Sequence, residues 1–173
     1  LLLFFAGCVA TGIFGIGRKI PMNRVNDLGQ REGYWRDSVG GGFVYDLYYK
    51  GGKKDGLYKR FYRNKLFLFG EYTADNMSGT WYMFGDEGEL RCTIDSIEFN
   101  KDSIYTGYPC CRIFRKYKCY CSDYYPGGGV EKEGYMVCDE DFMVDFWEIG
   151  EWKYYDESGN LIKTKDYGDR RTP

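Results

Sequence analysis

Histidine is absent, which excludes Ser-His and Cys-His catalysis, the facial triad and every His-ligated metal site. Alanine occurs only three times in 173 residues, whereas 24 Gly, 18 Tyr and 12 Phe are spread along the chain. Such a composition is poor in helix formers and rich in strand and turn formers. The 24 basic and 26 acidic side chains nearly cancel, so a net charge of -2 provides no electrostatic footprint for nucleic acid. We therefore expect a mostly β protein, one domain or one short repeat array, that does not bind nucleic acid.

Residues 1–17 contain no charged side chain, and the first cation is Arg18. We interpret this apolar N-terminal segment as a signal peptide or membrane anchor, followed by a linker over 18–25. Phe5-Ala6-Gly7-Cys8 resembles a bacterial lipobox, in which Cys8 is the lipidated residue. An uncleaved anchor and a cleaved secretory peptide are the two competing interpretations. All three place the folded part in the cell envelope, anchored by a lipid or a helix, or periplasmic or extracellular.

The sequence repeats itself with a period of 23 residues, set by Gly33, Gly56 and Gly79, and a further copy begins at Gly150. Each glycine opens the pattern Gly-x-aromatic, and the aromatic side chains are Trp35, Tyr58, Trp81 and Trp152. A second aromatic position follows three residues later in three copies, as Phe61, Phe84 and Tyr155.

The repeats divide the chain into segments. We expect three repeats over 26–94, an irregular insertion over 95–118, a degenerate repeat over 119–138, an insertion over 139–149, a final repeat over 150–167 and a tail over 168–173. In the degenerate copy, Cys119 and Cys121 stand where Gly and Trp are expected.

Each copy predicts a β-hairpin. A strand that alternates around Tyr58 is followed by the turn Arg63-Asn64-Lys65 and a returning strand over Leu66–Tyr72. One hairpin buries too little to be stable alone, so the copies must stack edge to edge. The fold expected is all-β: a single-layer, twisted antiparallel sheet of successive hairpins. Trp35, Tyr58 and Trp81 would then form one column, with about 0.2 to 1 kcal/mol from each cross-strand aromatic pair.

The strings GLYKRFYRNKLFLFGEY, GTWYMFGDEGEL and GEWKYYDESGNL resemble the bacterial variant of the MORN repeat. That resemblance implies a sheet of successive hairpins with roles in scaffolding, partner binding or membrane association, and no catalysis of its own. Bacterial members are also labelled antitoxin components or phosphatidylinositol phosphate kinases. The kinase label does not fit this chain, because it lacks a Gly-rich phosphate loop with a lysine strand and a catalytic Asp-plus-Asn loop.

Six cysteines follow Cys8: Cys92, Cys110, Cys111, Cys119, Cys121 and Cys138. In an exported protein they form disulfides or stay as buried free thiols, and the sequence does not decide between the two. A four-thiolate zinc site is the third interpretation, but the spacing CC-x7-C-x-C lacks paired CxxC knuckles. We predict no metal and no cofactor.

Two acidic groups have structural explanations. Asp86-Glu87-Gly88-Glu89 lies in an expected hairpin turn, and turn chemistry accounts for it better than calcium binding does. For Asp139-Glu140-Asp141 we expect a solvated loop or the start of a short helix through Trp147.

A basic run supplies possible contacts to lipid headgroups, worth about 1 kcal/mol for each close side chain, at Lys53, Lys54, Lys59 and Arg60. The alternative is a solvated face that protects sheet edges from pairing. The aromatic columns either only pack or also bind sugars or peptides.

The expected function is that of a non-enzymatic protein-interaction or scaffolding module of the bacterial cell envelope, with an unidentified protein partner. The alternatives are binding to an anionic membrane surface and an antitoxin-like partnership with a toxin. The last conflicts with export through residues 1–17.

Overall fold

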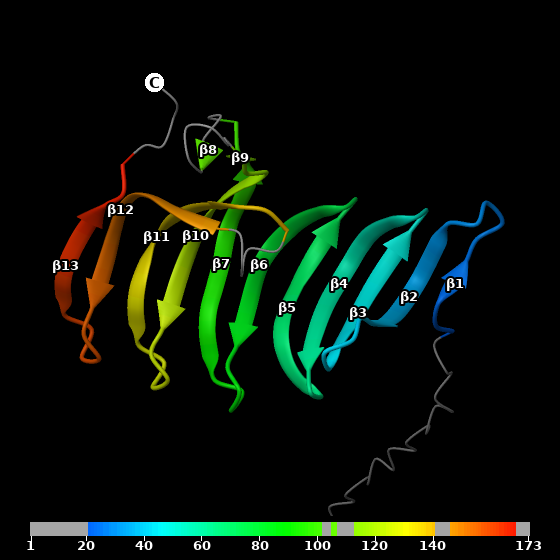
Figure 1. Ribbon diagram of the computed structural model, residues 1–173, viewed down its shortest axis with the longest axis horizontal. Helices are drawn as coiled ribbons and strands as arrows, with labels where there is room; N and C mark the ends of the chain where they lie inside the picture. Colours follow the sequence, from blue (N-terminus) through cyan, green and yellow to red (C-terminus); the bar gives the residue numbers. More distant parts are fainter. Residues whose placement is uncertain (1–20, 102–104, 107–112, 141–145, 169–173) are drawn as a thin grey trace, which may run out of the picture.

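The computed structural model describes residues 21–101, 105–106, 113–140 and 146–168, and in this part of the chain every regular element is a β-strand. Eleven strands form one antiparallel sheet in the order β1-β2-β3-β4-β5-β6-β7-β10-β11-β12-β13 (Figure 1). The sheet strands are β1 (Arg24–Val25), β2 (Arg31–Ser38), β3 (Phe43–Lys50), β4 (Lys53–Tyr62), β5 (Lys65–Thr73), β6 (Asn76–Phe84), β7 (Leu90–Phe99), β10 (Tyr117–Tyr124), β11 (Val130–Cys138), β12 (Phe146–Tyr155) and β13 (Leu161–Asp166). The expected all-β, single-layer sheet of successive hairpins is confirmed.

Five hairpins correspond to the five copies of the sequence pattern: β2–β3, β4–β5, β6–β7, β10–β11 and β12–β13. The β4–β5 turn places Arg63 and Asn64 at φ 48° and 65°, the left-handed geometry that two-residue hairpin turns require. Asp86-Glu87-Gly88-Glu89 lies in the β6–β7 turn, where the Gly85 N–H donates to the Glu89 carbonyl at 2.8 Å. The homologous turn after β12 has the same bond, from the Asp156 N–H to the Asn160 carbonyl at 2.9 Å. Turn geometry thus accounts for this acidic group.

The repeat glycines have a specific backbone role. Gly33, Gly56, Gly79 and Gly150 all have positive φ, at 73°, 118°, 64° and 62°. The pairing register shifts beside the last three of them, so each lies in a β-bulge at which the strand gains twist. In the degenerate copy, Cys119 replaces the glycine, and the left-handed residue is Ser96 on the neighbouring strand, at φ 51°. Such a residue keeps the bulge without requiring a left-handed cysteine.

The sheet extends into both segments that the sequence indicated as insertions. β7 continues to Phe99 and β10 begins at Tyr117; the described residues between them include the short pair β8 (Tyr105–Thr106) and β9 (Ile113–Phe114). Likewise, β12 begins at Phe146. The expected helix through Trp147 is therefore wrong, because Trp147 pairs with Val137 in the sheet.

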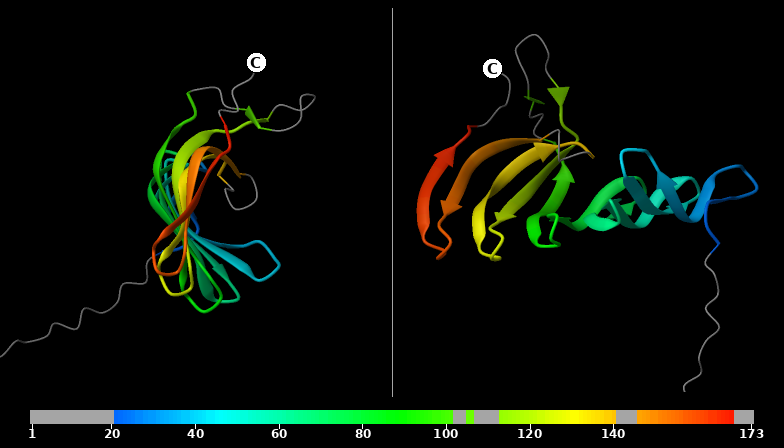
Figure 2. Two further views of the ribbon diagram at one scale, coloured as in Figure 1. Left: turned by 90° about the vertical axis from the view of Figure 1, so that its left-hand side faces the viewer. Right: turned by 60° about the horizontal axis from the view of Figure 1, so that its bottom comes forward.

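Asp139 and Glu140, at the start of the β11–β12 connection, lie in a loop with side chains 38% exposed, and both make ion pairs there. The Asp139 carboxylate accepts from Arg115 at 2.8 Å and from the Lys116 backbone N–H at 2.9 Å. Glu140 accepts from Lys116 Nζ at 3.2 Å and from Lys54 Nζ at 2.7 Å. Lys54 lies on β4, so Glu140 reaches back across several strands. Figure 2 shows the sheet strands as one curved and twisted layer. Asp141 lies outside the described residues.

We call the face with the buried aromatic rings the core face and the opposite one the outer face. The largest fully buried side chains of the core face include Trp81, Trp152, Tyr117 and Ile94. The sheet is a single layer, so these rings are buried largely by their neighbours in adjacent strands. Within the described residues no helix is long and apolar enough to cross a membrane. The interpretation of residues 1–17, including Cys8, concerns residues outside the described part.

Candidate functional site

The aromatic positions of the repeat fall on one line across the sheet. Directly opposed residues run from Trp35 through Leu47 to Tyr58, which is opposed to Gly70. The line continues through Trp81, Ile94 and Cys121 to Gly134, over which Trp152 lies. Cys121 thus occupies the tryptophan position of its repeat, as its spacing predicts. We call this line the aromatic row.

Two glycines let the rings of the row approach one another. The Tyr58 and Trp81 ring centroids are 5.4 Å apart although β5 separates their strands. That approach is possible because Gly70 lies between them: a Cβ at Gly70 would lie 2.2 Å from the Trp81 ring. Gly134 has the same relation to Trp152, with a Cβ distance of 2.5 Å. Where Leu47 stands in the equivalent place, Trp35 packs edge-on against Tyr49 at 6.0 Å.

The second set of aromatic positions closes the hairpins. Phe61, Phe84 and Tyr155 are each opposed to a leucine of the returning strand: Leu66, Leu90 and Leu161. All three rings are partly buried. Their position at strand ends accounts for their recurrence, and any binding role for them stays a prediction.

The four basic side chains considered for lipid binding do not gather on one face. Strand alternation and pairing place Lys54 and Arg60 on the core face, and Lys53 and Lys59 on the outer face. Lys54 is bound to Glu140 and lies 4.6 Å from the Tyr72 ring centroid. The Arg60 guanidinium lies 4.5 Å from the Phe43 ring centroid. These two cations therefore have structural roles within the sheet.

The outer face carries three separated pairs of aromatic rings. Their centroids lie 5.4 Å apart for Tyr34 and Tyr48, 6.0 Å for Phe69 and Tyr82, and 5.1 Å for Tyr120 and Tyr135. Tyr48 and Tyr135 are 37% and 45% exposed, and Leu57, on the same face, is 44% exposed. The same face also carries charged side chains: Arg36, Asp46, Lys59, Glu133 and Lys153. We call this surface the outer aromatic surface.

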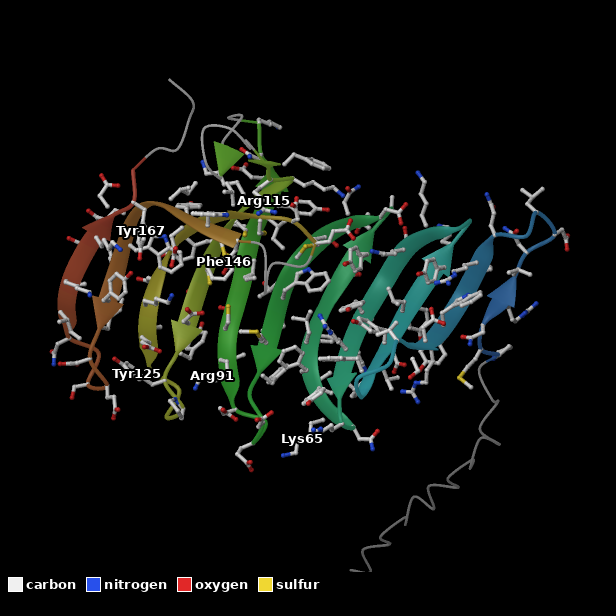
Figure 3. The ribbon with its side chains drawn as sticks, viewed as in Figure 1. Lys65, Arg91, Arg115, Tyr125, Phe146 and Tyr167 are labelled. Atoms are coloured by element: carbon white, nitrogen blue, oxygen red, sulfur yellow. The ribbon has the colours of Figure 1, made fainter. Side chains whose placement is uncertain are left out.

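The core face contains a cavity of about 180 Å³ beside the aromatic row. Its lining comes from β6, β7, β10, β11 and β12 and consists of Met83, Cys92, Ile94, Cys121, Asp123, Lys132, Met136, Phe146 and Trp152. Figure 3 shows Phe146 at the start of β12, lying in front of the sheet and over the strands that line the cavity.

The four described cysteines that follow Cys8 are buried free thiols in two close pairs. Cys92 and Cys121 have their sulfur atoms 3.4 Å apart, and Cys119 and Cys138 have theirs 3.6 Å apart. Members of a pair are diagonal neighbours, since Cys92 is opposed to Asp123 and Cys119 to Met136. Burial and the hydrogen bond to its partner raise the pKa of the Cys92 thiol, the hydrogen bond being the larger cause, so this group stays protonated. Cys110 and Cys111 lie outside the described residues.

Cys92 and Cys121 are 29 residues apart and converge only through strand pairing. The spacing of these cysteines in the sequence therefore did not predict the pair. The sequence indicated only that Cys121 occupies the position of the repeat whose side chain faces the core.

Fold and surfaces define a class: an open, single-layer array of β-hairpins whose rings pack in one row on the core face and whose outer face carries exposed aromatic side chains. No family model, no curated protein and no solved structure matches the chain. The likeness to the MORN repeat accordingly stays a prediction from the sequence.

Proposed function

We propose that this chain is a non-enzymatic interaction module that binds a protein partner through the outer aromatic surface. The observation that carries the proposal is the exposure of Tyr48, Leu57 and Tyr135, on a face that spans most of the sheet. Tyrosines and apolar side chains interspersed with charges are typical of protein interfaces, where aromatic residues are enriched and a polar rim surrounds them. The core face is already packed and supports the scaffold.

The test uses the immobilised protein as bait against envelope fractions, with a variant of the proposed surface beside it. Leu57→Asp combined with Tyr135→Asp should abolish the capture of any partner that the wild-type protein retains, because both charges would be desolvated in the interface. Leu161→Asp is the matched control: Leu161 is 54% exposed but lies on the edge strand β13, and this variant should capture as well as wild type. Equal capture by all three proteins would refute the assignment of the surface.

A second candidate is binding to an anionic membrane surface, and the paired lysines of the β3–β4 turn favour it. Lys50 and Lys53 are directly opposed and both exposed, on the same face as Lys59. Attraction of two or three such cations to anionic lipid would contribute about 1 kcal/mol each. Sedimentation with vesicles rich in phosphatidylserine at low salt tests it: Lys50→Gln with Lys53→Gln should reduce binding, and absence of binding by wild type would remove the hypothesis.

We also propose that the protein acts in the cell envelope, on the strength of the uncharged segment over 1–17. A reporter fused after Pro173 that is active only outside the cytoplasm should give a signal, and deletion of 1–17 should abolish it. A cytoplasmic result would favour the antitoxin-like alternative, in which the same outer aromatic surface would bind a toxin.

A further inference from the structure

Three potential metal ligands converge in the wall of the core-face cavity. The Cys92 and Cys121 sulfur atoms and a carboxylate oxygen of Asp123 all lie within 4.8 Å of one another. The two cysteines are 4% and 5% exposed and Asp123 is partly exposed, so the sulfur atoms are buried while the carboxylate lies nearer the solvent.

The distances between these atoms fit tetrahedral zinc. With Zn–S bonds of about 2.3 Å and Zn–O bonds of about 2.1 Å, two sulfur ligands are about 3.8 Å apart and a sulfur and an oxygen about 3.6 Å apart. The corresponding distances are 3.4 Å between Cys92 Sγ and Cys121 Sγ, and 3.7 Å between Cys121 Sγ and Asp123 Oδ1. Small side-chain rotations would complete the fit.

Charge and orientation also suit a divalent ion. Asp123 turns Oδ1 toward Cys121, while its Oδ2 accepts from Lys132 Nζ at 3.2 Å. Lys132 is held in turn by Glu148 at 3.7 Å. Carboxylates that bind zinc are commonly oriented by a hydrogen-bond donor on their other oxygen, and Lys132 is such a donor for Asp123. Two thiolates and the Asp123 carboxylate balance the charges of Zn(II) and Lys132, and Glu148, which is partly exposed, leaves the whole group with one negative charge.

A disulfide between the same sulfurs fits less well. Cys92 and Cys121 are diagonal neighbours on β7 and β10, and Cα atoms of diagonal pairs lie about 7 to 8 Å apart. That separation exceeds the usual limit of about 7 Å for a bridge without backbone movement.

We propose that Cys92, Cys121 and Asp123 bind one Zn(II) ion in the wall of the core-face cavity. The cavity beside them provides space for a water molecule as fourth ligand, and the thioether side chains of Met83 and Met136 line it as well. Binding converts both thiols to thiolates and therefore releases two protons for each ion bound. The ion would join β7 to β10, the two sheet strands with the longest connection in the chain.

The experiment titrates the full-length, reduced protein with Co(II) as a spectroscopic substitute and then displaces it with Zn(II). Wild type should show thiolate-to-cobalt charge-transfer absorption that Zn(II) abolishes. Cys92→Ala and Cys121→Ala should each weaken Zn(II) binding by more than about 100-fold, the loss that even outer contacts of a zinc site can cause. Asp123→Asn should weaken it as well, while leaving both thiols in place.

The matched control is the double variant Cys119→Ala with Cys138→Ala. This pair is equally buried and its sulfurs are 3.6 Å apart, but neither residue lines the cavity or belongs to the three-ligand group. The double variant should keep the charge-transfer absorption and the Zn(II) affinity of wild type.

Two results would overturn the proposal. One is unchanged cobalt absorption in Cys92→Ala and Cys121→Ala, which would assign the metal to other cysteines of the chain. The other is a bridge between Cys92 and Cys121, detected by mass spectrometry of the protein purified without reductant. Asp123→Asn removes no core side chain. If a cysteine variant fails to fold, the Zn(II) affinity of Asp123→Asn therefore tests the site, and an affinity equal to that of wild type would count against it.

Discussion

Replacement of Gly70 by alanine tests the packing of the aromatic row most directly. The new Cβ would lie 2.2 Å from the Trp81 ring, whereas carbon atoms in contact are about 3.5 to 4.0 Å apart. The ring would have to retreat by more than about 1 Å to restore such a contact. Trp81 is only 1% exposed, so no free space receives it. Gly70 does not have a positive φ, so the penalty is steric and not conformational.

The magnitude follows from two opposing terms. Overpacking a filled core costs about 1 to 3 kcal/mol. Loss of flexibility in the unfolded chain returns about 0.4 to 1 kcal/mol when glycine becomes alanine. Gly70→Ala should therefore lower the free energy of unfolding by about 1 to 2 kcal/mol, or the melting temperature by roughly 2 to 8 °C for a chain of this size.

The assay is equilibrium unfolding in urea, followed by tryptophan fluorescence. Gly127→Ala is the matched control, because Gly127 lies in the β10–β11 loop without a positive φ, and an added Cβ would meet nothing within 4 Å. It should leave the stability unchanged or raise it by up to about 1 kcal/mol, the gain expected from a less flexible unfolded chain. Trp81→Phe in the Gly70→Ala background should recover part of the loss, since a smaller ring leaves room for the methyl group. Equal stability of Gly70→Ala and Gly127→Ala would refute the close approach of Trp81 to the Gly70 backbone.

Two further outcomes are expected. Gly79→Ala should lower the free energy of unfolding by about 1 to 2 kcal/mol for conformational reasons alone, because φ is 64° and the nearest atom to an added Cβ is 4.0 Å away. Gly79→Asn should lower it by less, because asparagine tolerates a positive φ better than alanine does. Equal losses of stability for the two variants in urea titrations would contradict the bulge geometry. Glu140→Gln should lower stability by about 0.5 to 1 kcal/mol near neutral pH, since it breaks the ion pairs with Lys54 and Lys116. Partial burial opposes ionisation of Glu140, but the hydrogen bonds and charges of the two lysines lower its pKa overall. The stabilisation by the ion pairs is therefore present above about pH 4.5, the ordinary pKa of a glutamate, and is lost as the pH falls through the depressed pKa. The free energies of unfolding of wild type and Glu140→Gln should converge in that acidic range. A difference between them that stays constant from neutral pH down through this range would show that Glu140 acts through its shape and not its charge.

The repeat pattern was informative because local chemistry determines it. The spacing of Gly56 and Gly79 reflects a left-handed residue at each bulge, and Tyr58 and Trp81 follow at the positions that face the row. These requirements hold within a single hairpin, so they recur in each copy of the sequence. Even the degenerate copy keeps the register, with Cys121 in the row.

The candidate metal group was beyond such reasoning. Cys92 and Asp123 belong to different hairpins, and their approach depends on how β7 pairs with β10 after a long connection. Lys53 and Lys54, by contrast, are adjacent in a strand, so simple alternation places them on opposite faces.

The sequence by itself determined the all-β class, the five hairpins and the single line of aromatic positions, because a 23-residue period repeats the same local turn and bulge chemistry. Only the tertiary structure decided which face stays exposed, how Glu140 reaches Lys54 and which sulfurs become neighbours. Those features arise from strand register and from a chain segment folding over the sheet, and both join residues that no local pattern connects.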